Sequence, residues 1–272
     1  MYICRAKRLK YQSSEPRKRH FCGKWYGTMA LFCLVILPSL VFALDDSDIA
    51  SFQKQISHKP IGERIALWAE KFVGTPYDPD PLGEYVRRNV IVADDRVDCM
   101  YHSFRTLELA MSDTPEEAIR VALDKRFMER GILESGVVVN YNDRFQYGED
   151  MLDSGKWGKE ITGDIGPVTT IKGSRGRVKV GMVSKNNLIK NFNKSSQLAV
   201  KNGDFVFFIK SPKRRVANEI VGHIGIIKRE GNDIYLIHAS GSKNNGGEVR
   251  KVLFLNYVST MPFAGVRVSR FP

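Results

Sequence analysis

Apolar residues recur at every third or fourth position in three stretches of the first half of the chain. One is residues 61–74, "IGERIALWAEKFVG", and a second follows Cys99. The third, residues 114–131, begins with Thr114 and has Glu117 three positions later, which is the signature of a capped helix start. In the stretch after Cys99 the apolar positions are Met100, Phe104, Leu107 and Met111. The spacing therefore predicts three amphipathic helices.

The second half of the chain changes to short runs of β-branched and aromatic residues, which are typical of strands. The five runs are residues 203–210, 219–230, 233–240, 248–255 and 264–271. The turn "GND" joins the second run to the third, so these two are predicted to form an antiparallel hairpin. The glycine-rich "SGSKNNGGE" lacks the lysine-serine ending of a phosphate loop and is interpreted as another hairpin turn. Helices followed by an antiparallel sheet predict an α+β fold.

The N-terminal 43 residues have the pattern of a secretory signal peptide. Residues 1–27 are rich in Arg and Lys, residues 28–43 are apolar, and Val41-Phe42-Ala43 suits cleavage before Leu44. We therefore expect an exported protein, periplasmic or secreted, that meets the membrane only through this leader. The alternative is an uncleaved anchor, although sixteen residues broken by Pro38 fall short of the roughly 20 that a spanning helix needs.

Much of the positive charge lies in the leader. It holds eight basic residues and one acidic residue, so seven of the formal +12 charges leave with it. Residues 44–272 keep about +5, which suits an anionic cell-wall polymer or simply a solvated surface of mixed charge. No nucleic-acid-binding signature is present in the sequence, and no nucleic-acid partner is expected. These residues are long enough for one large core or two small ones.

Three of the four cysteines, Cys4, Cys22 and Cys33, fall in the leader, so an exported chain keeps only Cys99. Without a partner for an intrachain disulfide, this thiol is either buried and inert or used for its reactivity. Its predicted place at a helix N-terminus favours the thiolate and predicts a lowered pKa. Asp98 is predicted to be the N-cap of that helix.

A nucleophilic thiolate needs a histidine to exchange protons with it. His223 and His238 lie in the two strands of the predicted hairpin, where they can be neighbours and form a base with a polar residue that orients it. A competing interpretation is a zinc site formed by Cys99, His102, His223 and His238. We favour the metal-free and cofactor-free interpretation, with His102 at the surface or behind the site.

The order of four short motifs resembles the NlpC-type papain-like cysteine hydrolases of bacterial cell walls. They are "GTPY" at 74–77, "DC" at 98–99, "GHIGI" at 222–226 and "IHAS" at 237–240. The resemblance is closest to the N-acetylmuramoyl-L-alanine amidase-like branch, because residues 140–166 and 263–271 are similar to that branch in particular. It extends from about Glu63 to Phe271.

The resemblance implies a papain-like fold with Cys99 as nucleophile, His223 as base and His238 as the residue that orients the base. It places Tyr77 at the substrate site, and Asp98 is a second candidate substrate contact. The chain departs from the wider family in two places. Met100-Tyr101 replaces the usual Ser-Gly after the cysteine, and residues 78–97 form a longer segment before it than in the small endopeptidases.

The function implied is cleavage of the amide between N-acetylmuramic acid and L-alanine, in peptidoglycan or muropeptides. Residues 131–200 are interpreted as an insertion that walls the substrate site. One alternative is a stem-peptide endopeptidase that cuts between D-glutamate and the diamino acid. Another is a non-catalytic cell-wall binding protein, against which the retained thiol and histidines argue.

Overall fold

The computed structural model describes residues 44–195, 198–243 and 245–272. The signal peptide predicted at 1–43 lies outside these residues. No helix within the described ranges has the length and apolar character to cross a membrane.

Six of the nine α-helices in the described residues precede the main sheet in the chain. The first five are α1 (Asp46–Ile56), α2 (Ile61–Lys71), α3 (Glu84–Arg87), α4 (Cys99–Ala110) and α5 (Pro115–Lys125). The others are α6 (Gly148–Asp153), α7 (Thr162–Ile165), α8 (Lys185–Ser195) and α9 (Phe254–Thr260), with 3-10 turns at Tyr141–Asp143 and Pro212–Arg214. The three predicted helices are confirmed as α2, α4 and α5. Thr114 caps α5, since its side chain accepts the N–H of Glu117 at 3.2 Å.

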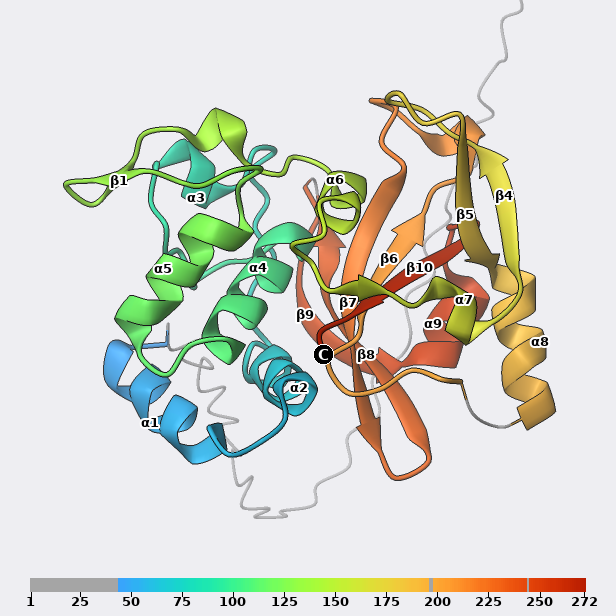
Figure 1. Ribbon diagram of the computed structural model, residues 1–272, viewed down its shortest axis with the longest axis horizontal. Helices are drawn as coiled ribbons and strands as arrows, with labels where there is room; N and C mark the ends of the chain where they lie inside the picture. Colours follow the sequence, from blue (N-terminus) through green and yellow to red (C-terminus); the bar gives the residue numbers. More distant parts are fainter. Residues whose placement is uncertain (1–43, 196–197, 244) are drawn as a thin grey trace, which may run out of the picture. The chain divides into compact units, whose positions relative to one another are not determined.

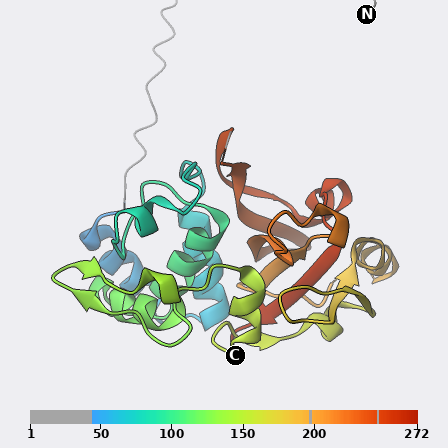
Figure 2. The same cartoon turned by 90° about the horizontal axis from the view of Figure 1, so that it is seen from above.

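An antiparallel sheet of eight strands follows in the order β4-β5-β10-β6-β7-β8-β9, with β3 paired to β10. Its strands are β3 (Lys159–Glu160), β4 (Val168–Lys172), β5 (Lys179–Ser184), β6 (Phe205–Ile209), β7 (Val221–Glu230), β8 (Asp233–Ser242), β9 (Gly246–Leu253) and β10 (Gly265–Arg270). A separate hairpin joins β1 (Leu133–Glu134) to β2 (Val137–Val138). Figures 1 and 2 show α1–α5 gathered beside the sheet, with α8 and α9 on its other side.

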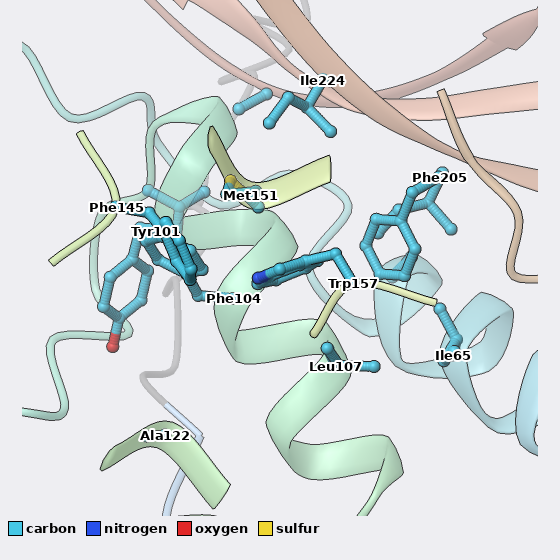
Figure 3. Packing of buried hydrophobic residues seen from close by; sticks show 14 of the residues in the cluster. Ile65, Tyr101, Phe104, Leu107, Ala122, Phe145, Met151, Trp157, Phe205 and Ile224 are labelled. Atoms are coloured by element: carbon cyan, nitrogen blue, oxygen red, sulfur yellow. The ribbon is translucent and has the colours of Figure 1, made fainter. Parts of the chain in front are cut away.

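Both faces of the sheet are covered, which explains why every residue of β6 is buried. Phe205 and Phe207 belong to the core shared with α1–α5, whereas Val206 and Phe208 belong to the core under α8 and α9. Figure 3 shows Trp157 lying between Phe205 of the sheet and Phe104 of α4, with ring centroids 5.4 and 5.5 Å from its own. The helix α4 is therefore packed firmly on the sheet.

Two sequence-based expectations need correction or extension. The strand predicted at 248–255 ends at Leu253, and Phe254 begins α9 because its ring packs under the sheet, in the core with α8. Residues 131–200, predicted as an insertion that walls the substrate site, contain β3, β4 and β5, which belong to the main sheet. The predicted α+β class is confirmed, and helices followed by an antiparallel sheet are consistent with a papain-like fold.

Candidate active site

Cys99 is the first residue of α4, as the sequence predicts. Asp98 is its N-cap, because one carboxylate oxygen accepts the backbone N–H of Tyr101 at 2.8 Å. The helix packs against β7 and β8, the two strands that carry the histidines. The sulfur therefore lies where a helix start meets the sheet.

The two hairpin histidines are neighbours, and this prediction is confirmed. His223 Nε2 lies 2.8 Å from His238 Nδ1, with the rings nearly perpendicular. Both side chains belong to the β7–β8 hairpin, in which Ile226 pairs with Ile237. Because this hydrogen bond uses Nε2 of His223, its Nδ1 is the nitrogen left for exchange with another group.

The protonation of Cys99 differs from the sequence-based expectation. Burial, followed by the negative charge of Asp98, raises the pKa of the Cys99 thiol to about 12. Hydrogen bonding from the backbone N–H of Ile224 and the charge of Lys243 oppose this rise without reversing it. The helix start alone does not decide the pKa, and the resting thiol keeps its proton at neutral pH.

The histidines are also neutral. Burial lowers the pKa of His238 to about 4, and burial together with the neighbouring His238 and His102 takes the pKa of His223 well below its ordinary value. A neutral imidazole can accept a proton, whereas a protonated one cannot. The resting site thus holds a protonated thiol, Cys99, beside Ile224 of β7, the strand that also carries the neutral His223.

Tyr77, which the family resemblance places at the substrate site, lies near Cys99. Its backbone N–H donates to the Gly247 carbonyl at 2.8 Å, and it forms a β-bridge to Val97, two residues before Cys99. Gly241 lies against its ring, since a Cβ there would sit 2.4 Å from the Tyr77 Cγ. Burial, and then the negative charge of an ionised Cys99, raise the pKa of Tyr77, so its hydroxyl stays a donor at neutral pH.

The departure at Met100-Tyr101 has a structural explanation. Tyr101 is buried, and its hydroxyl accepts the N–H of Ala93 at 2.6 Å and donates to Asp94 at 2.8 Å. Asp94 also pairs with the buried Arg105 at 2.9 Å. Tyr101 therefore ties the long 78–97 segment to α4 and does not face a substrate.

Sequence analysis missed three residues near the site. Tyr257 of α9 and Phe263 pack beside His223, with ring centroids 6.2 and 6.3 Å from its ring. Both are half-buried, and burial together with a negative charge on Cys99 raises the pKa of Tyr257. Lys243 ion-pairs with Asp98. No local signal marks these residues, because only the folded chain brings α9 and the β8–β9 turn to Cys99.

His102 is buried rather than at the surface. Its ring packs edge-on against Phe72 at 5.7 Å, and neither ring nitrogen makes a hydrogen bond of normal geometry, although the Ala69 carbonyl lies near. Among the described residues, no group of three or more His, Cys, Asp or Glu side chains is arranged to hold a metal ion. The four residues of the zinc hypothesis therefore do not converge on one point.

His102 leads to a prediction about stability and pH. Burial lowers its pKa to about 4, so between about pH 6.5 and 4 the unfolded chain takes up a proton that the folded chain refuses. The contribution of neutral His102 to the free energy of unfolding is present above about pH 6.5 and is lost as the pH falls. As the pH falls from 7 to 4.5, the free energy of unfolding of His102→Leu should decrease by about 2 to 3 kcal/mol less than that of the wild type. Urea unfolding at the two pH values measures this difference. Parallel pH curves would contradict this, and His58→Leu, at an exposed position, is the matched control.

Two cavities in the described part of the protein lie away from Cys99 and the histidine pair. One, of about 360 Å³, is lined by residues that include Glu160 and Arg267, and the other, of about 660 Å³, by residues that include Ile61 and Phe271. Neither is lined by Cys99 or the histidine pair. The chemical groups, rather than cavity size, identify the candidate site.

No family model matches the sequence, and no curated protein matches it. Solved structures do resemble it. An N-acetylmuramoyl-L-alanine amidase from Bacteroides uniformis is 18% identical with a TM-score of 0.58, over 76% of this chain and 97% of that one. Protein LPG0564 from Legionella pneumophila, of the DUF1460 family, is 15% identical with a TM-score of 0.61, over 84% and 94%.

A putative xylanase from Bacteroides fragilis is also similar, at 18% identity and a TM-score of 0.54, over 75% of this chain and 98% of that one. At such identities the likeness concerns the backbone arrangement and carries no activity with it. The chain shares the fold of these three proteins over nearly their whole length.

Proposed function

We propose that this protein is an exported cysteine amidohydrolase that cleaves the amide between N-acetylmuramic acid and L-alanine in peptidoglycan fragments. The observation that carries the proposal is the 2.8 Å hydrogen bond between His223 and His238, on the strands against which the Cys99 helix start is packed. The name of the Bacteroides uniformis neighbour supports the choice of bond.

Nucleophilic attack begins from the neutral pair. His223 Nδ1 takes the thiol proton as Cys99 Sγ attacks the amide carbonyl carbon, and His238 Nδ1 accepts the Nε2–H of the imidazolium that forms. Because the thiol pKa is raised, proton transfer and carbon–sulfur bond formation occur together rather than from a stored thiolate. The first N–H groups of α4 have no partner within the helix and stabilise the oxyanion.

Breakdown of the tetrahedral intermediate completes the cycle. His223 returns the proton to the departing alanine nitrogen, which leaves the lactyl carbonyl as a thioester on Cys99. Water then attacks the thioester, with the neutral His223 as base, and releases the lactyl carboxylate. This route needs no metal or cofactor.

Several segments of the chain lie around the proposed nucleophile. The 78–97 segment is fastened to α4 through Tyr101, and Tyr77 bridges to Val97 at its end. On the sheet side, Tyr257 and Phe263 flank His223. A bulky sugar on the acyl side of the scissile amide calls for such extended walls, which a compact stem-peptide endopeptidase does not require.

Product analysis tests the proposal. Residues 44–272 incubated with soluble muropeptides should release a stem peptide whose L-alanine carries a free amine, together with a sugar whose lactyl group ends in a carboxylate. Mass spectrometry distinguishes these from fragments cut after D-glutamate, which would establish an endopeptidase. Soluble fragments should be cut faster than whole sacculi. Binding without any cleavage would identify a cell-wall binding protein.

A further inference from the structure

Lys243 connects the β8–β9 turn to the residues around the nucleophile. Its ammonium lies 3.1 Å from a carboxylate oxygen of Asp98 and 3.2 Å from the backbone carbonyl of Asp78. It also lies 5.6 Å from the centre of the Tyr77 ring. One lysine thus contacts the N-cap of the Cys99 helix and two residues of the preceding segment, although 145 positions separate it from Asp98.

The carboxylates around this lysine are already engaged. Asp98 uses one oxygen to cap α4 and the other for Lys243. The buried Asp78 accepts the backbone N–H groups of Asp80 and Glu84 at 2.9 and 2.7 Å. Asp80 pairs with Arg87. None of these three carboxylates is therefore left without a partner to bind the ammonium group of a substrate beside Cys99.

The charge at the site has a consequence for substrate choice. A peptide that begins with L-alanine carries a positive amine two residues from the bond an endopeptidase cuts, whereas muramic acid converts that amine to a neutral amide. Lys243 repels the free amine directly, and by pairing with Asp98 it occupies the carboxylate that would attract that amine. The acylated nitrogen carries no charge to repel.

We propose that Lys243 is a specificity-determining residue that occupies Asp98 and so selects substrates whose alanine nitrogen is acylated. This inference deepens the proposed function, on which it rests for the identity of the acyl group. Lys243 acts through its own charge and through Asp98, and not on the reacting atoms. It is a positioning residue for charge.

The test measures binding, so it does not require turnover. In Cys99→Ala protein, L-alanyl-γ-D-glutamate and its N-acetyl form are titrated separately to 20 mM and followed by NMR. With Lys243 present, the N-acetyl form should bind at least tenfold more tightly. Lys243→Met should reduce that preference about tenfold by strengthening the free-amine form, and Lys243→Arg should keep it because arginine retains the ion pair.

Further variants separate charge selection from a merely structural role. Lys243→Met combined with Asp98→Asn should lose the gained amine binding, since asparagine still caps the helix but carries no charge. Lys213→Met, at an exposed position, is the matched control and should change nothing. Above the pKa of the dipeptide amine, near 8, the two ligands should converge.

Several results would overturn the inference. They are equal affinities of the two dipeptides for protein that keeps Lys243, no binding of either dipeptide, an unchanged affinity ratio in Lys243→Met, or equal weakening of both dipeptides in that variant. Muropeptide products cut elsewhere would instead overturn the proposed amidase activity, while leaving this ratio as measured. The two failures are therefore distinguishable.

Discussion

Cys99→Ala should lower the rate of muropeptide hydrolysis by about four orders of magnitude or more, because no other side chain can form the thioester. The fold should survive, since Cys99 is only partly buried and alanine suits a helix start. The measurements are kcat/KM with soluble muropeptides and the thermal midpoint, which we expect to change by only a few degrees.

Chemical treatments separate this mechanism from zinc catalysis. Iodoacetamide should inactivate the wild type, slowly at pH 7 and faster as the pH rises toward the raised pKa of Cys99, because the thiolate is the reactive form. A chelator should leave activity unchanged. Full activity in Cys99→Ala, or loss of activity with the chelator alone, would refute the proposed chemistry.

His223→Ala should cost about three to four orders of magnitude in kcat, because it removes the proposed base and the acid for the leaving amine. His238→Ala should cost less, on the order of a hundredfold, since the base remains but loses the acceptor 2.8 Å from its Nε2. His238→Asn should recover part of this loss, because an amide oxygen can accept the same N–H.

The order of these effects is the informative result. The proposed roles require His223→Ala to be the most damaging and His238→Asn the least damaging of the three. Equal and complete losses, with intact circular dichroism spectra, would show that the two histidines do not have the unequal roles of base and orienting residue.

Much of the site follows from local sequence. Helical spacing after Cys99, with Asp98 before it, predicts a capped helix that begins at Cys99, and the structure confirms this. The turn "GND" between two β-branched runs predicts the hairpin that joins His223 to His238. Both depend on residues close together in the chain, where backbone propensities and turn geometry act directly.

Other features depended on contacts between distant parts of the chain. The pKa of Cys99 rises because burial disfavours the thiolate and because the negative charge of Asp98 lies near, and these two effects outweigh the helix start. The last part of the run at 248–255 becomes α9 because Phe254 finds a place in the second core. Local propensity does not predict the raised pKa of Cys99 or the start of α9, since both depend on which surfaces the folded chain buries.

The amino-acid sequence by itself determined three of the helices and the hairpin, and it named the candidate reactive side chains, because period and turn chemistry are local properties. Only the tertiary structure decided which groups surround the thiol: Lys243 on Asp98, Tyr257 and Phe263 beside His223, and the buried His102. Lys243, Tyr257 and Phe263 come from segments more than a hundred residues from Cys99 in the chain. The charges and burial that set protonation exist only when the chain is folded, and so do the contacts on which the proposed substrate choice rests.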